Sequence, residues 1–203
     1  TLYMTLASTL FGYIIGLPMG IVLTVTDKDG IRPNAAVYKV LDVISNLLRS
    51  IPFIILLIVL IPFTRFVVGR SYGSTATIVP LTIAAAPYIA RMVESSLKEV
   101  DAGVIEAARS MGASDFQIVT KVMLVEARTS LIVGATISLG TILGYSAMAG
   151  TVGGGGLGDI AIRYGYTRWQ TDIMVVTVVL LVILFQIFQT IGMKIANRLD
   201  RRK

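Results

Sequence analysis

The side chains that most often carry enzyme chemistry are missing from this sequence. It contains neither histidine nor cysteine, which excludes imidazole acid–base catalysis, thiol nucleophiles, disulfides and Cys/His metal sites. The glycine run at 153–158 spells G-x-G-x-x-G, but a dinucleotide site also needs a preceding strand and a βαβ unit. These glycines lie between two long apolar segments, and no GK[ST] sequence follows them. We interpret the run as a tight loop of closely approaching backbones, and we predict no catalytic residue, metal or cofactor site in this chain.

The composition indicates the environment that the chain must occupy. Of its 203 residues, 55% are hydrophobic and only 15% are charged, against about 25% charged residues in a typical soluble domain. The mean hydropathy is +0.79. This is too little charge to cover a water-facing surface, which argues against a soluble enzyme and against a nucleic-acid binder. The formal net charge of +6 is instead typical of a membrane protein with basic cytoplasmic loops.

Five apolar stretches are long enough to cross a bilayer, because about 20 helical residues at roughly 1.5 Å each span a hydrocarbon core of about 30 Å. We place them at about 1–26, 41–66, 71–93, 129–149 and 170–193. Their residues are apolar at successive positions, whereas the strands of a membrane barrel alternate. The sequence therefore predicts an all-α membrane protein with five transmembrane helices in a single domain, 1–203.

Glycines recur at four-residue spacing in two of these stretches, at Gly12, Gly16 and Gly20 and again at Gly140 and Gly144. Small residues at this spacing let membrane helices approach one another closely. We expect the glycines to mark packing seams, either within the chain or between two subunits.

Lys and Arg are divided unequally between the two sides that five spans create. Fourteen of the 18 fall in segments 27–50, 91–130 and 194–203, and four fall on the other side. The positive-inside rule then places the C-terminus in the cytoplasm and Thr1 outside. Aromatic residues fall near the outer ends of spans, where interfacial belts are expected: Tyr72, Tyr164, Tyr166 and Trp169.

The longest polar segment, 94–128, predicts a helical elbow on the cytoplasmic side. Apolar residues recur at helical spacing in its first half: Val104, Ile105, Ala108 and Met111. This spacing predicts a helix near 101–111, which Gly112 would end. Ser114 followed by Gln117 matches a capping box that opens a second helix toward the fourth span. A structured loop without a docking role is the alternative interpretation.

The elbow resembles the "EAA" motif of ABC importer permeases, which reads EAA, three residues, G, nine residues, I, one residue, L, P. The residues that match it are Glu106, Ala107, Ala108, Gly112 and Leu124. Val122 replaces the Ile of the motif, and Val125 replaces its Pro. The resemblance implies that this elbow couples the chain to a separate ATPase subunit by docking into a groove on it.

Three further segments are similar to the permeases of methionine ABC importers: SIPFIILL at 50–57, PLTIAAAPYIARMVE at 80–94 and GYSAMAGTVGGGGLGDIAIRYGY at 144–166. The resemblance implies the type I importer permease fold in a bacterial cytoplasmic membrane. It also implies a homodimer embedded in lipid, two ATPase subunits that hold ATP and magnesium, and an extracytoplasmic methionine-binding protein or lipoprotein. Such a complex would import methionine and related amino acids.

A candidate gate lies near the outer end of the fourth span, at Tyr145, Ser146 and Met148. The methionine side chain is unbranched and polarisable, so it could close a narrow pore and reopen it. By the resemblance, Met148 belongs to the gate near the dimer axis. A methionine that faces lipid or the core is the alternative.

Other functions must be weighed against this hypothesis. One is an ABC permease for another small amino acid or anion, and another is a secondary carrier or channel that works without an ATPase. Ion-driven carriers usually place ionisable residues at mid-membrane, whereas charged residues such as Arg49, Arg91 and Asp172 fall at the ends of spans, as interfacial anchors do. A membrane enzyme is a third alternative that no group of residues supports, so we expect a translocation subunit whose ATP is hydrolysed elsewhere.

Overall fold

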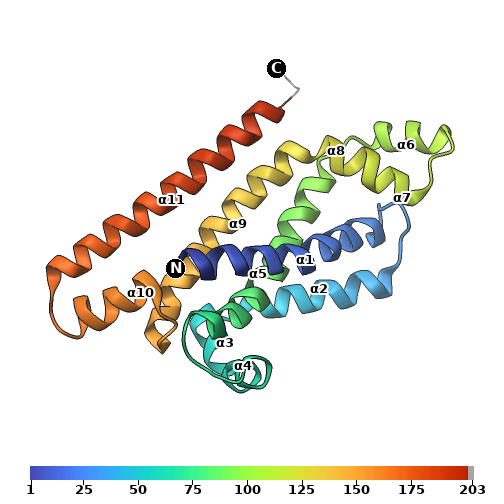
Figure 1. Ribbon diagram of the computed structural model, residues 1–203. Helices are drawn as coiled ribbons and strands as arrows, with labels where there is room; N and C mark the ends of the chain where they lie inside the picture. Colours follow the sequence, from blue (N-terminus) through green and yellow to red (C-terminus); the bar gives the residue numbers. More distant parts are fainter. Residues whose placement is uncertain (201–203) are drawn as a thin grey trace.

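Four long helices dominate the computed structural model, which describes residues 1–200 (Figure 1). They are α1 (Leu2–Thr26), α5 (Ser74–Lys98), α9 (Arg128–Met148) and α11 (Thr171–Leu199). Each is long and apolar enough to cross a membrane. Regular structure in the described part of the chain is helical throughout, which confirms the predicted all-α fold.

A fifth candidate span is broken rather than straight. It consists of α2 (Ala35–Ser50) and α3 (Phe53–Val59), whose axes differ by 102°, and α4 (Ile61–Val68) follows. Pro52 explains the break, because it lacks an N–H and pushes the preceding residue out of the helical region. Ile51 is accordingly extended, with φ −81° and ψ 125°. The stretch 41–66, expected as one span, is thus divided among three helices.

Helix α5 lies at the centre of the molecule, and α11 lies at its periphery. In the most apolar window of each helix, 56% of residues are buried in α5 but only 6% in α11. Leu81, Ile89 and Leu97 of α5 are almost fully buried. Helix α11 lies along α9 and exposes Val, Leu and Ile side chains along most of its length (Figure 1). Such a surface suits contact with lipid hydrocarbon.

The glycine seam of α1 packs within the chain, against α5. A Cβ added at Gly16 would lie 2.6 Å from the carbonyl oxygen of Ala86, and one at Gly20 would lie 2.5 Å from that of Ala90. The backbones of α1 and α5 therefore touch where only glycine fits. This confirms the intrachain alternative for α1. Gly140 likewise meets the Phe185 ring of α11, whereas nothing described lies within 4 Å of a Cβ at Gly144.

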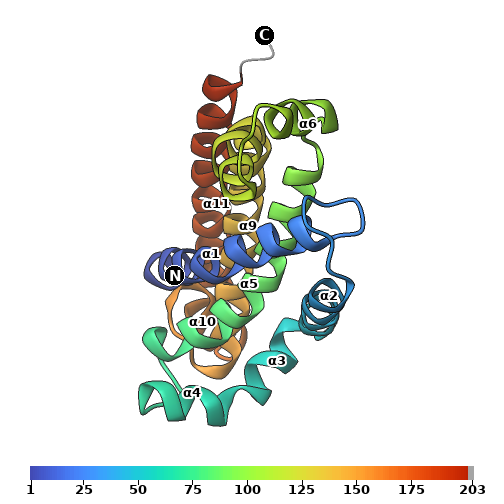
Figure 2. The ribbon, with the colours of Figure 1, turned by 90° about the vertical axis from the view of Figure 1, so that its right-hand side faces the viewer.

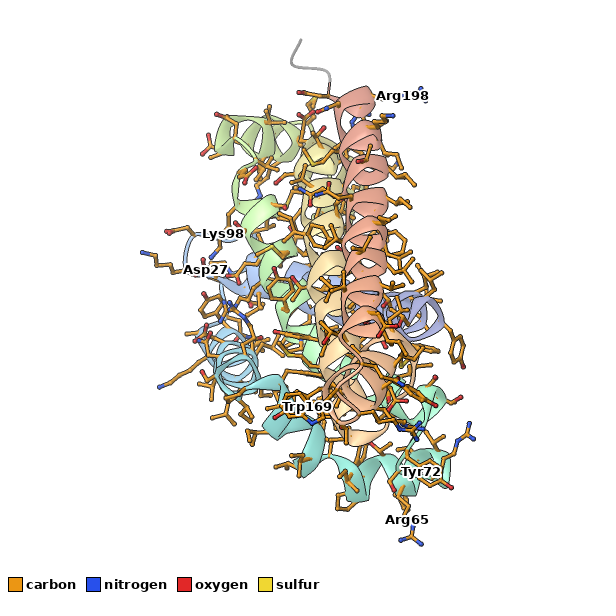
Figure 3. All side chains as sticks on the ribbon, turned by 90° about the vertical axis from the view of Figure 1, so that its left-hand side faces the viewer. Asp27, Arg65, Tyr72, Lys98, Trp169 and Arg198 are labelled. Atoms are coloured by element: carbon orange, nitrogen blue, oxygen red, sulfur yellow. The ribbon has the colours of Figure 1, made fainter. Side chains whose placement is uncertain are left out.

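Short helices gather at the two ends of the long ones. One end carries α6 (Ala102–Ser110), α7 (Asp115–Gln117), η1 (Ile118–Met123) and α8 (Leu124–Glu126). The opposite end carries α4, η2 (Ala149–Val152), α10 (Gly156–Ile160) and η3 (Ala161–Tyr166), as two perpendicular views show (Figures 1 and 2). Arg198 lies toward the first end, and Arg65, Tyr72 and Trp169 lie toward the second (Figure 3).

Candidate functional site

The first half of the elbow is helix α6, which ends at a glycine in the left-handed conformation. Asp101 caps its start, since the side chain accepts a hydrogen bond of 2.7 Å from the Gly103 N–H. Gly112 has φ +83°, a region that residues with a Cβ rarely adopt. The predicted helix near 101–111 and its glycine stop are therefore confirmed.

The second half begins with the predicted capping box. The Ser114 hydroxyl accepts a hydrogen bond of 3.4 Å from the Gln117 N–H, and the Gln117 side chain accepts one of 2.9 Å from the Ser114 N–H. From there α7, η1 and α8 continue with helical dihedral angles toward α9. Val125, which replaces the motif proline, lies within α8, and the chain turns two residues later at Ala127 (φ −78°, ψ 0°), between α8 and α9. The π-helical turn η1 has no signal in the sequence.

The motif residues divide between the inside and the outside of the elbow. Ala108 is 5% exposed and belongs to the hydrophobic core with Ile118. Glu106 and Ala107 are exposed. Ala108 is small because α6 and η1 are in close contact there. Ala107 lies on the exposed side of α6, where a partner could contact it.

Two large apolar side chains on the elbow face solvent. Met111 is 82% exposed and Phe116 is 76% exposed. Met111, the last of the four residues whose spacing predicted the helix, is its C-cap and lies in the terminal turn, where the helix has stopped. Phe116 was not singled out from the sequence. Exposed apolar residues of this size beside charged ones indicate an interaction surface.

The three candidate gate residues do not point to one place. Met148 is the last residue of α9 and is half exposed. The Tyr145 ring stacks on Phe53 of α3, with centroids 4.5 Å apart and planes 7° apart. Ser146 is fully buried, accepts a hydrogen bond of 3.3 Å from the Thr5 hydroxyl of α1 and donates one to the Leu143 carbonyl.

The glycine run fixes the end of α9 next to Met148. A Cβ at Gly158 would lie 2.0 Å from the Ala147 carbonyl oxygen, and one at Gly150 would lie 2.3 Å from the Gly158 carbonyl carbon. The Gly153 carbonyl also accepts a hydrogen bond of 3.0 Å from the Gly73 N–H at the start of α5. The run is thus the tight loop of closely approaching backbones that the sequence predicted.

A charged cluster that sequence analysis missed joins α1, α2 and α5 below the elbow. Arg91, expected as an interfacial anchor, instead pairs with Glu94 on its own helix and with Asp42 on α2. At the end of α5, the Lys98 ammonium lies 2.7 Å from the Asp27 carboxylate, which follows α1. This hydrogen bond lowers the pKa of Asp27 below its usual value. The partners are far apart in the sequence, so no local pattern indicates them.

A helical membrane chain with an exposed elbow at one end and a closely packed glycine loop at the other fits the class of transporter permease subunits. Residues 12–203 match the family described as binding-protein-dependent transport system inner membrane component, and the chain belongs to this family. It is therefore an ABC importer permease subunit of the inner membrane, which excludes the carrier, channel and enzyme alternatives.

Within this family, the chain is similar to methionine permeases. The chain is 49% identical to the probable D-methionine transport system permease protein MetI of Vibrio cholerae, over all of this chain and 90% of the relative. It is 56% identical to the D-methionine transport system permease protein MetI of Escherichia coli, over 74% of this chain and 69% of the relative.

Solved structures agree with this assignment. An inward-facing MetNI methionine ABC transporter contains a chain that is 52% identical to this one, with a TM-score of 0.97 over 98% of this chain and 93% of that chain. A crystal structure of an amino acid ABC transporter with histidines matches with a TM-score of 0.73 at 22% identity, over 96% and 90% of the two chains. The second likeness shows the shared fold alone.

Proposed function

We propose that two copies of this chain form the membrane pathway of an importer for methionine and related amino acids. The observation that carries the proposal is the 49% identity to a methionine permease over the whole chain. Two ATPase subunits would hold ATP and magnesium and drive the cycle, and an extracytoplasmic methionine-binding protein or lipoprotein would deliver the solute. The two copies would alternate between inward-facing and outward-facing states as the ATPase subunits close and open.

The elbow is the proposed ATPase-docking surface. It presents Glu106, Ala107 and Gly112 together with the exposed side chains of Met111 and Phe116. Apolar side chains at the centre of such a patch supply contact area, and the carboxylate supplies orientation toward a basic groove. Ala108 takes no direct part, because it packs against the elbow's second helix.

Met148 is the proposed gate residue, with Tyr145 as its support. The half-exposed Met148 side chain lies at the end of α9, where it could meet its copy across a two-fold axis. The stack of Tyr145 on Phe53 holds the last turn of α9 against α3. Ser146 contributes by tying the same turn to α1 through Thr5.

The proposed orientation puts the elbow and the C-terminus in the cytoplasm and Thr1 outside. Exposed aromatic residues support it, because Tyr72 and Trp169 are 70% and 84% exposed and lie at the end opposite Arg198 (Figure 3). Aromatic rings at that level suit the outer membrane interface, and clustered cations suit the inner one.

Uptake by a reconstituted complex tests the proposal. The chain, its ATPase subunit and its binding protein would be assembled in vesicles, and ATP-dependent accumulation of labelled L- and D-methionine would be measured. Adding other small amino acids or anions as competitors tests whether the complex instead imports one of these solutes. ATP-dependent uptake of a different solute, with none of methionine, would overturn the substrate assignment and leave the family assignment intact.

A further inference from the structure

Polar contacts at one face attach helix α2 to the rest of the molecule. On its other side α2 exposes a row of apolar residues: Val37, Val40, Val43, Ile44 and Leu47. Tyr38, Asp42 and Asn46 recur every four residues and so share one face of the helix. This face lies against the last turns of α5, so charges and hydrogen bonds position α2 there, while Leu48 near its end packs against the hydrophobic core.

Arg91 of α5 is the centre of this contact. Its Nη1 donates to Glu94 at 2.7 Å, and its Nη2 contacts the Asp42 carboxylate and donates to Asn46 Oδ1 at 3.1 Å. The Arg91 side chain is 16% exposed and that of Glu94 is 6% exposed. The Asp42 side chain is 31% exposed, so moving α2 away from α5 is costly mainly for Arg91, whose largely buried guanidinium would lose one partner. The cluster therefore holds α2 in one position relative to α5.

The cluster continues to the end of α1. The Lys98 ammonium contacts Glu94 at 2.8 Å and Asp27 at 2.7 Å, and the Tyr38 hydroxyl donates to Glu94 at 3.4 Å. Glu94 thus links both cations and joins α2 to α5, and Lys98 extends the cluster to Asp27 after α1. The cluster contains three carboxylates and two cations, and each cation pairs with two carboxylates.

The elbow is connected directly to this cluster. Lys98 is the last residue of α5, and the elbow starts at Asp101. The Arg109 guanidinium of α6 donates a hydrogen bond of 2.9 Å to the Ile31 carbonyl, in the loop between α1 and α2. A cavity of about 430 Å³ separates α6 from the ends of α1 and α5. The chain at 98–101 and this hydrogen bond are therefore the two connections between the elbow and the cluster.

The other end of the α2–α3 unit touches the gate region. Phe53 starts α3 directly after the bend at Pro52, and its ring is 7% exposed and stacked on Tyr145. Tyr145 is three residues from Met148 on the same helix. A movement of α2 and α3 as one piece would therefore reach the last turn of α9.

We propose that Arg91 is a positioning residue, and that its cluster clamps α2 to α5 so that elbow displacement moves Phe53 and Tyr145 beside the gate. The clamp joins α2 to α5, and α2 continues through Pro52 into α3, whose first residue stacks on Tyr145. This inference rests on the proposed function, because it assigns the cluster to the coupling between ATP hydrolysis and transport.

Asp42→Asn is the first test, in the assembled complex. It removes the charge that reaches Arg91 from α2, and it leaves Arg91 paired with Glu94. We expect ATP hydrolysis to continue while the amount of solute moved per ATP falls by roughly 2- to 30-fold, the range found for residues along coupling networks. Asn46→Ala, a milder change in the same contact, should lower this ratio in the same direction and serves if Asp42→Asn does not assemble.

A covalent link between positions 42 and 91 distinguishes a role of the cluster in positioning α2 from a role in folding. The double variant Asp42→Cys, Arg91→Cys removes one charge of each sign and leaves Glu94 paired with Lys98. Its low ratio of transport to hydrolysis should rise toward the wild-type value after a short bifunctional thiol reagent joins the two residues in the assembled complex. The native chain has no cysteine, so within this subunit the reagent meets only the introduced pair.

A matched control is Lys28→Gln on the same side of the membrane. It removes an ion pair with Asp29 whose two side chains are 85% and 82% exposed, and the ratio should not change. An unchanged ratio in Asp42→Asn and Asn46→Ala would overturn the clamp. So would a lowered ratio that the tether does not restore, because the cluster would then serve folding alone.

A readout without solute distinguishes this inference from the proposed function. Spin labels at Lys39→Cys on α2 and Ser95→Cys on α5 occupy exposed positions. Their distance distribution should stay narrow in every nucleotide state of the wild-type complex and broaden in Asp42→Asn. Equal widths in both would refute the clamp even if methionine is transported, and a broadened distribution would support it even if the solute is a different one.

Discussion

At the residue scale, Gly112 is required for its backbone conformation and not for its small size. Its φ is +83°, and nothing described lies within 4 Å of a Cβ placed there. A side chain would therefore have room, but the left-handed conformation costs most residues roughly 1–2 kcal/mol. The glycine keeps α6 and α7 at the angle that exposes Met111 and Phe116 together.

Gly112→Leu should therefore uncouple the complex, while Gly112→Asn should nearly preserve coupling, because Asn tolerates the left-handed region. The measurement is stimulation of ATP hydrolysis by the loaded binding protein in purified complexes of equal subunit content. Equal stimulation in the leucine variant would show that the turn is not needed for docking.

Asp27 lies at the same scale and gives a prediction about pH. Its pKa is lowered by the hydrogen bond from Lys98, so its contribution to stability is complete above the ordinary Asp pKa of about 3.9 and disappears as the pH falls through the lower folded value. Asp27→Asn should destabilise the detergent-solubilised chain by roughly 1–2 kcal/mol. The difference in unfolding midpoint between variant and wild type should be as large at about pH 5 as at pH 7. A difference that shrinks by about pH 5 would contradict the assignment.

At the scale of the elements, the α1–α5 contact depends on glycines that no larger residue can replace. A Cβ at Gly16 would lie 2.6 Å from the Ala86 carbonyl oxygen and 2.9 Å from the Ile89 side chain. Both contacts are shorter than packed atoms allow, and a carbonyl of α5 cannot move aside as a flexible side chain could. The seam therefore fixes the distance between the two helices.

Gly16→Ala should lower stability by roughly 1–3 kcal/mol, the usual cost of overpacking. The measurement is the unfolding midpoint of the purified chain in detergent, with Gly144→Ala as the control. Nothing described approaches a Cβ at Gly144, and alanine is favoured over glycine inside a helix, so this variant should unfold at or slightly above the wild-type midpoint. Equal midpoints for the two alanine variants would mean that α1 and α5 separate more easily than their contact suggests.

At the scale of the whole molecule, the proposed dimer places two Met148 residues at a common axis. Met148→Cys should then form a disulfide between subunits under mild oxidation in the state that closes the gate, since bridging needs Cα atoms within about 7 Å. Non-reducing electrophoresis in the apo, ATP-bound and ADP-bound states gives the readout. Ser146→Cys is the matched control, because its side chain is buried against α1. Absence of the crosslink in every state would move the gate elsewhere.

The orientation of the molecule is tested independently by labelling in intact cells. Ser114→Cys lies on the exposed elbow and should react with a membrane-permeant maleimide but not with an impermeant one. Tyr72→Cys, at the opposite end, should react with both (Figure 3). Labelling of position 114 by the impermeant reagent would reverse the proposed topology.

The sequence by itself determined the class of the fold and the form of the elbow, because both follow from short-range physics. Apolar runs specify membrane helices, and a serine followed three residues later by a glutamine specifies a helix start. A glycine after the last apolar repeat specifies the end of the preceding helix, and the structure shows that glycine at φ +83°. Even the seam at Gly16 could be recognised, since four-residue spacing is a property of one helix.

Only the tertiary structure decided which distant residues meet. Arg91 contacts Asp42, which is 49 positions away, and the Ser146 hydroxyl accepts a hydrogen bond from Thr5, which is 141 positions away. Arg91, expected as an anchor, therefore lies at the centre of a charged cluster, whereas the role of Ser146 at the gate stays a prediction. Pro52 predicts that the helix breaks after α2. The size of the bend, 102°, depends on where α3 packs. Whether a residue starts, continues or ends a helix depends on its neighbours along the chain. Which distant residue it contacts depends on how whole helices pack.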